Sequence, residues 1–280
     1  MSQSPGTQVM ERAASSASAA VAPEALVVVD RVSKRFVLPG RPPALALQEV
    51  SFQVAAGEFL CILGPSGCGK STLLNMLAGF TAPSTGELRY RGRPVTGPGP
   101  DRTMVFQDYA LFDWMTVADN VAFGLVANGT PAAERRRRVM ALLELVGLTT
   151  FATRYPHELS GGMRQRVGLA RALAPDPDVI LLDEPFAALD LLTRELMQEE
   201  MLRLQQDSGK TFILITHSVE EAVFLGNRVL LMSTGPGRIE EDLTIDLPTM
   251  RTAEMRTENK NFLAYREHLS ALLRRGLRIT

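Results

Sequence analysis

Residues 64–72 read Gly-Pro-Ser-Gly-Cys-Gly-Lys-Ser-Thr, which fits the pattern G-x-x-x-x-G-K-[S/T]. An apolar run at 59–63 precedes this stretch, and a helical pattern at 70–78 follows it. In a strand–turn–helix of this kind, backbone N–H groups point at phosphates. We therefore predict that this loop binds a nucleoside triphosphate through Gly64, Pro65, Ser66, Gly67, Cys68, Gly69, Lys70, Ser71 and Thr72.

Two side chains of this loop have chemistry of their own. Lys70 can bring a positive charge to the β- and γ-phosphates. Ser71 can offer its hydroxyl to Mg²⁺, which prefers a few hard oxygen ligands together with phosphate oxygens. The expected ligands are therefore a nucleotide and Mg²⁺.

Two carboxylates follow a second apolar strand, predicted at 179–182. Asp183 and Glu184 end this strand, and a buried carboxylate pair is costly unless a cation lies nearby. We expect Asp183 to belong to the Mg²⁺ shell, directly or through water. Glu184 is the expected general base for the attacking water, a role that contributes about 10²–10⁴-fold in rate.

A second anion-binding feature lies at 159–165, which reads Leu-Ser-Gly-Gly-Met-Arg-Gln. Ser160 and the two glycines after it open an apolar-periodic run, which indicates a helix N-terminus able to hold an anion. The chain therefore has two predicted phosphate-binding segments, far apart in the sequence.

The composition excludes some classes of function. The chain has 280 residues, with 30 basic and 31 acidic side chains and a net charge of −1, so nucleic acid is not expected as a partner. The run Arg135–Arg138 is interpreted as a solvated helix face. Only Cys61 and Cys68 occur, which favours a reducing compartment. No run approaches the ~20 apolar residues of a membrane span, and no signal peptide is evident, so we expect a soluble chain.

The pattern along the chain alternates between strands and helices, which favours an α/β core of parallel type. Residues 1–24 are Ser/Ala-rich and are expected to form a disordered tail. A helical stretch interrupts the α/β pattern from about 116 to 174, and a charged amphipathic helix is predicted at 251–275. Strands are predicted at 25–30, 49–54, 59–63, 87–91, 103–106, 179–182, 211–216 and 228–232, and helices at 70–78, 193–206 and 219–225.

From about Ala25 to Met232 the chain resembles the ATP-binding subunit of ATP-binding cassette (ABC) transporters. The motifs described above occur in the order found in that family. The resemblance implies an α/β P-loop NTPase of the ABC ATPase fold, with a mixed β core. It implies an ATPase domain at 25–250 with an inserted α-helical subdomain at about 108–175, followed by a helical tail at 251–280.

The resemblance also assigns roles to single residues. Phe36 matches the aromatic that stacks on adenine, and Gln107 matches the Q-loop glutamine that reaches Mg²⁺ and the attacking water. Asp183 and Glu184 match the Walker B aspartate and the catalytic glutamate. The remaining matches are the signature residues Ser160, Gly161, Gly162 and Gln165, the D-loop Asp190, and the switch histidine His217.

The family works as an assembly, so the resemblance implies partners. The signature motif of one copy serves the ATP held by a second copy, which gives an ATP-bound homodimer. The helical insert, with 109–117, is where the family docks a transmembrane permease, on the cytoplasmic face of the inner membrane as a peripheral subunit. A substrate-binding protein is an indirect partner.

Several segments are similar to the nitrate/sulfonate/taurine class of importers, among them Thr96–Arg102, Trp114–Val117, Asn120–Gly124 and Ser233–Ile239. One position departs from that class, because Asp113 stands where proline is expected before the tryptophan. The substrate itself does not contact this subunit in the family.

Three alternatives stay open from the sequence. The chain could serve an importer for another small solute, or be a soluble ABC ATPase of DNA repair or translation. Such soluble proteins usually carry two cassettes or a long coiled-coil insertion, and about 50 residues separate Gln107 from the signature here. The third alternative is a non-catalytic nucleotide-binding regulator, which the presence of Glu184 and His217 disfavours.

Overall fold

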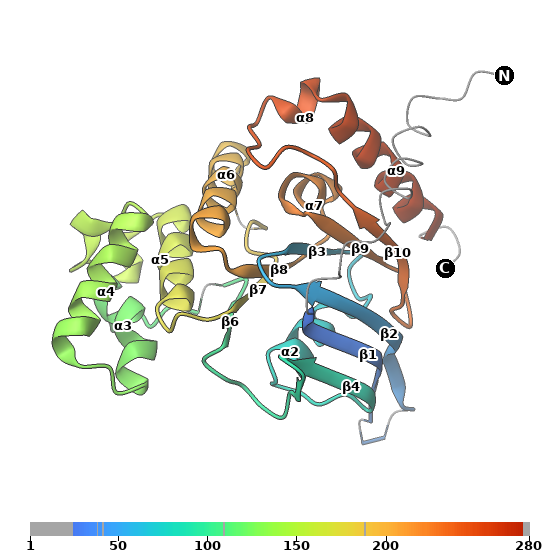
Figure 1. Ribbon diagram of the computed structural model, residues 1–280, viewed down its shortest axis with the longest axis horizontal. Coiled ribbons are helices and arrows are strands. Elements are labelled where there is room, and N and C mark those ends of the chain that lie inside the picture. Colours follow the sequence, from blue (N-terminus) through green and yellow to red (C-terminus); the bar gives the residue numbers. More distant parts are fainter. Residues whose placement is uncertain (1–24, 38, 41, 109, 188, 277–280) are drawn as a thin grey trace. The chain divides into compact units, whose positions relative to one another are not determined.

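The computed structural model describes residues 25–276 except 38, 41, 109 and 188 (Figure 1). The tail predicted at 1–24 lies outside the described residues. The chain divides into two compact units, Met1–Gly97 with Ile213–Thr280, and Pro98–Phe212.

An antiparallel sheet forms one part of the first unit. Its order is β2-β1-β4-β5, with β1 at Ala25–Phe36, β2 at Ala44–Ala55, β4 at Thr85–Tyr90 and β5 at Arg93–Pro94. Val27 pairs with Val54 and Val29 pairs with Phe52, and all four side chains are buried. Alternate residues of a strand face the same side, so this pairing builds one apolar face.

A second sheet of the first unit carries the glycine-rich loop. Its strands in this unit are β3 (Phe59–Leu63), the part of β8 (Thr211–Thr216) from Ile213 onward, β9 (Arg228–Met232) and β10 (Ile239–Thr244). All five residues of β3 are buried, as expected for a strand covered on both faces. β9 runs parallel to β3, with Cys61 opposite Val229, and β10 adds an antiparallel edge. The sheet is therefore mixed, as the resemblance implied.

The helices of the first unit are α2 (Lys70–Leu77), α7 (Val219–Leu225), α8 (Met255–Glu258) and α9 (Lys260–Gly276). α7 packs against β3 and against α9 (Figure 1). Phe262, Tyr265 and Leu269 form the buried stripe of α9. The prediction of one helix over 251–275 is partly wrong: Arg251 precedes the helices and is buried, and the helical part is broken at Asn259.

The second unit combines two parallel strands with a group of helices. β6 (Arg102–Val105) pairs with β7 (Val179–Asp183), and Met104 lies opposite Leu181. The helical elements are α3 (Val117–Ala127), α4 (Ala132–Leu145), the 3₁₀ turns η1 (Thr149–Phe151) and η2 (Pro156–Glu158), α5 (Gly161–Leu173) and α6 (Leu191–Ser208).

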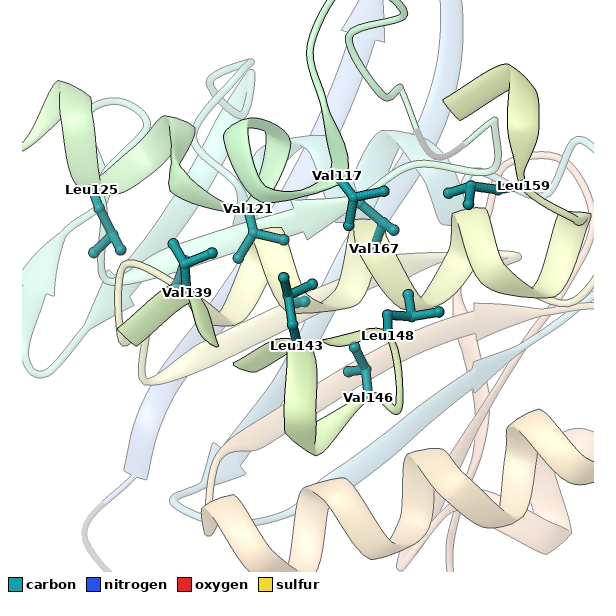
Figure 2. Packing of buried hydrophobic residues seen from close by; sticks show 11 residues of the cluster. Val117, Val121, Leu125, Val139, Leu143, Val146, Leu148, Leu159 and Val167 are labelled. Carbon is teal, nitrogen blue, oxygen red and sulfur yellow. The ribbon is translucent and has the colours of Figure 1, made fainter. Parts of the chain in front are cut away.

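Helices α3, α4 and α5 share one apolar core (Figure 2). Val121 of α3, Leu143 of α4 and Val167 of α5 are each fully buried in it. Burying a side chain of this size stabilises a fold by roughly 1.5–3 kcal/mol. The predicted helical insert therefore has its own core.

Candidate nucleotide site

The loop at 64–72 has the backbone shape that its glycines allow. Gly67 and Gly69 have φ values of 80° and 97°, in the left-handed region. A Cβ added at Gly69 would lie 2.7 Å from Leu47 Cδ2 and 2.9 Å from the carbonyl oxygen of Ala46. Because β2 lies so close, only glycine fits at the position where the loop enters α2.

Lys70 folds back onto the loop that precedes it. Its ammonium donates hydrogen bonds to the carbonyl oxygens of Gly64, at 2.8 Å, and Pro65, at 3.0 Å. Only 5% of the residue is exposed. The charge is thus fixed against the loop backbone, in the place where the sequence predicted contact with phosphates.

His217 follows β8 and is exposed. The residues on either side of it are tied to the first turn of α7. Thr216 Oγ1 donates to Glu221 Oε2 at 2.7 Å and accepts from the N–H of Ser218 at 3.0 Å. Ser218 in turn caps α7, because its hydroxyl accepts from the N–H of Glu221. The position of His217 therefore depends on α7.

Phe36, the predicted adenine contact, ends β1 with 42% of its surface exposed. The ammonium of Lys34 lies 5.3 Å from the centre of its ring. An exposed aromatic face of this kind can stack on a base.

In the second unit, β7 ends at the predicted carboxylate pair. Asp183 is the last residue of the strand and Glu184 follows it with a φ of 44°. Both residues are half-buried and not fully buried as the sequence predicted, because this end of β7 reaches the surface. Accessible carboxylates can act on water and bind a cation without the full cost of burial.

Ser160 is the N-cap of α5, which confirms the helix N-terminus predicted from the sequence. Its hydroxyl accepts a hydrogen bond from the N–H of Met163 at 3.3 Å, and Gly161 and Gly162 open the helix. Gln165 differs from these residues, because only 1% of it is exposed and neither atom of its amide has a hydrogen-bond partner among the described residues. The sequence predicted Gln165 as one of the signature residues, but in the structure its side chain is buried.

Two further predicted residues are exposed in the second unit. Gln107 lies just beyond β6. Asp190 caps α6, and the backbone N–H of Thr193 holds the pKa of this carboxyl below its usual range. The first unit thus contains Phe36, the 64–72 loop and His217, and the second contains Gln107, Ser160, Gly161, Gly162, Gln165, Asp183, Glu184 and Asp190.

A shallow groove in the second unit brings part of the predicted docking stretch at 109–117 together with Arg171, which the sequence did not single out. It has a volume of about 350 Å³ and is lined by Phe106, Ala110, Phe112, Phe123 and Arg171, among others. The ring centres of Phe112 and Phe123 lie 4.6 Å apart, and 44% of Phe123 is exposed. Of the predicted docking stretch at 109–117, Tyr109 lies outside the described residues.

A P-loop after a buried strand, a carboxylate pair after another, and a capped Ser-Gly-Gly helix define an ATPase of the ATP-binding cassette class. The profile of the ABC transporter family matches residues 47–187, and the chain belongs to this family. It is therefore an ATP-hydrolysing cassette, as the resemblance implied.

Curated relatives include a taurine import ATP-binding protein, TauB, of Roseobacter denitrificans. It is 56% identical over 214 residues, which cover 76% of this chain and 80% of that protein. TauB of a Jannaschia species is 48% identical and covers 88% of this chain and 93% of its own length. The nitrate import ATP-binding protein NrtC of Synechococcus elongatus is 44% identical, covering 90% of this chain and 39% of NrtC.

Solved structures with this fold include the ABC cassette MJ0796 as a dimer bound to ADP and Pi. It has a TM-score of 0.69 and 32% identity, and it covers 79% of this chain and 100% of its own. Among the described residues of our chain, no helix has the length and apolar character needed to cross a membrane.

Proposed function

We propose that this chain hydrolyses ATP to power the import of a small solute, of the taurine or nitrate kind, through a membrane permease. The names of its relatives support this function, since taurine import proteins match at 48–56% identity and a nitrate import protein at 44%. The observation that carries the ATPase chemistry is Glu184, an accessible carboxylate directly after the strand that ends in Asp183.

The proposed roles of the residues follow from their chemistry. Lys70 and the N–H groups of the 64–72 loop hold the β- and γ-phosphates, and Phe36 stacks on the adenine. Glu184 takes a proton from the attacking water, which Gln107 helps to orient. His217 binds the γ-phosphate, and positioning and charge stabilisation of this kind supply most of the catalysis of phosphoryl transfer.

Mg²⁺ is the proposed cofactor. The hydroxyl of Ser71 and the carboxylate of Asp183 are hard oxygen donors, and Mg²⁺ typically takes only one or two protein ligands beside phosphates and water. The described residues contain no group of three or more His, Cys, Asp or Glu that could hold a metal alone. A site of this kind fits a metal that arrives with the nucleotide. The bound cation would neutralise phosphate charge.

The functional unit we propose is a homodimer. The N-terminus of α5, with Ser160, Gly161 and Gly162, would serve the ATP held by the P-loop of a second copy, and Asp190 would contact that copy. The dimeric solved cassettes support this assembly. ATP then stabilises the closed dimer because it binds that state better than the open one.

The groove beside Phe112 and Phe123 is the proposed docking surface for the permease, on the cytoplasmic face of the membrane. Trp114, at 74% exposed, lies 5.4 Å from Phe112 between ring centres. Trp114 and Phe123 are exposed and Phe112 is half-buried, and an aromatic cluster of this kind is typical of an interaction surface. A substrate-binding protein would act with the permease and not with this chain directly.

The substitution Glu184→Gln tests the ATPase mechanism. Glutamine keeps the size of the side chain but cannot accept the proton, so we expect kcat to fall by about 10²–10⁴-fold while ATP binding is kept. The trapped dimer should appear on size exclusion with ATP. If this variant hydrolyses ATP at the wild-type rate, Glu184 is not the general base.

Transport is tested by uptake in cells of the source organism that lack the gene. We expect the uptake of labelled taurine or nitrate to be lost, and to return with the wild-type gene but not with Glu184→Gln. Unchanged uptake of both solutes would exclude this substrate class. If the protein purified from membranes never associates with a permease, the transport function itself is contradicted.

A further inference from the structure

The segment that follows β10 holds helix α7 at both of its ends. α7 begins two residues after His217, and its seven residues include the fully buried Val223, Phe224 and Leu225. α7 packs between β3 and α9 (Figure 1). Two arginines of the C-terminal segment, Arg251 and Arg256, make the polar contacts to it.

Arg251 holds the C-terminal end of α7. Its guanidinium Nη1 donates to the carbonyl oxygens of Val223, Phe224 and Gly226 at 2.8–3.0 Å, and its Nε donates to Pro248 at 3.0 Å. Only 6% of Arg251 is exposed, and its burial lowers the pKa of the guanidinium to about 10. A cation at this end satisfies carbonyls that the helix leaves open and complements the helix dipole.

Arg256 reaches the opposite end of the helix. Its Nη1 lies 2.8 Å from Glu220 Oε1, in the first turn of α7, and its guanidinium carbon lies 3.9 Å from the centre of the Phe224 ring. The residue is 6% exposed. An ion pair with one buried partner is harder to break than a surface pair, because the remaining charge loses its compensation.

The first turn of α7 is also the part that holds the backbone around His217. Glu221, next to Glu220, accepts the hydroxyl proton of Thr216 and donates its N–H to Ser218. The contact of Arg256 to Glu220, the peptide link from Glu220 to Glu221 and the contacts of Glu221 to Thr216 and Ser218 therefore connect the arginine to the residues on either side of His217.

We infer that Arg256, together with Arg251, is a positioning residue for His217. Through these two arginines, the segment that follows β10 sets the rate at which ATP is hydrolysed. This inference rests on the proposed role of His217 at the γ-phosphate. Neither arginine belongs to the proposed nucleotide site. Both contact α7, and α7 holds the turn that carries His217. A shift of about 1 Å in a catalytic group can lower the rate on the order of 100-fold, so contacts that fix the position of His217 affect kcat.

The test uses the full-length chain with Arg256→Ala, Arg256→Lys and Glu220→Gln. We expect Arg256→Ala and Glu220→Gln to lower kcat by about tenfold while KM for ATP changes by less than about twofold, because the P-loop still binds ATP. Arg256→Lys should recover part of the rate. The ring signal of His217 in a ¹H–¹³C NMR spectrum, assigned with His217→Gln, should shift in both slow variants.

A matched control is Glu241→Gln. Glu241 of β10 pairs with His268 of α9 at 2.8 Å, so this change weakens another contact of the C-terminal segment without touching α7. We expect it to leave kcat and the His217 signal unchanged. Glu220 has an exposed side chain, so Glu220→Gln keeps the test valid if Arg256→Ala unfolds the chain.

Two results would overturn the inference: wild-type kcat with an unmoved His217 signal in folded Glu220→Gln, or an equal loss of kcat in Glu241→Gln. The proposed function fails in a different way. If His217→Ala hydrolyses ATP at the wild-type rate, the role of His217 is wrong, whereas the NMR signal still reports whether the C-terminal segment positions its ring.

Discussion

The backbone of Glu184 has a φ of 44°, in the left-handed region that residues with a Cβ rarely occupy. The conformation costs roughly 1–2 kcal/mol for an L-residue other than glycine. The carbonyl of Glu184 accepts a hydrogen bond from Ala187, which closes the turn after β7. Strain of this kind at a predicted catalytic residue is consistent with a side chain held for function.

This strain predicts the order of stability of two inactive variants. Glu184→Ala keeps the Cβ at a positive φ, whereas Glu184→Gly relaxes it, so we expect the glycine variant to be more stable by about 1 kcal/mol. Both variants lack the carboxylate and should lose turnover. The free energy of unfolding in urea measures the difference, and equal values for the two variants would exclude backbone strain at this position.

Single residues were predictable where a local pattern sets their role. The Ser-Gly-Gly motif predicted a helix N-terminus, and Ser160 caps α5 as expected. Arg251 and Arg256 could not be predicted in this way, because their partners on α7 lie 27–36 residues away along the chain. The burial of Gln165 was likewise hidden, since a glutamine in a signature motif does not show which way its side chain points.

At the scale of elements, the loop before α3 is organised by one buried amide. Asn120 Oδ1 accepts from the N–H of Phe112 at 2.9 Å, and its Nδ2 donates to the carbonyls of Phe112, Met115 and Thr116. Arg171 of α5 adds a hydrogen bond to the carbonyl of Ala110 at 2.7 Å. The aromatic side chains of the docking groove are thus placed by contacts from α3 and α5.

The substitution Asn120→Ala should release this loop. It leaves buried backbone groups without partners, so we expect the free energy of unfolding to fall by about 1–3 kcal/mol. Permease-stimulated ATPase activity in a reconstituted complex should fall further than basal activity. The control is Asn128→Ala, an exposed asparagine at the end of the same helix. Equal stimulation in the two variants would contradict the role of the loop in docking.

Elements with strong apolar patterns were predicted well, and polar edges were not. The bounds of β3, β8, α7 and β9 are confirmed residue for residue. β10 was missed because Ile239–Thr244 is acidic and only one of its residues is buried, so that pairing with β9 is what makes it a strand. β1 continues to Phe36 beyond its predicted end, because pairing with β2 overrides the polar sequence after Asp30.

At the scale of the whole molecule, the order of the motifs implied the family before any geometry was known. The family profile and the relatives confirm it. The predicted site residues nevertheless fall in both compact units, and the signature is proposed to serve a second copy. The resemblance implied this pairing; the residue patterns alone did not, because a pattern along the chain does not show which surfaces of two copies meet.

The most direct test of the central claim, a catalytic site shared by two copies, mixes two variants that are each inactive. Lys70→Ala lacks the P-loop cation, and Ser160→Arg blocks the signature helix. We expect neither to hydrolyse ATP alone. An equimolar mixture should recover about a quarter of wild-type activity, since half of the dimers are mixed and each mixed dimer has one intact site. Wild-type turnover by Ser160→Arg alone, or no recovery on mixing, would contradict the shared site.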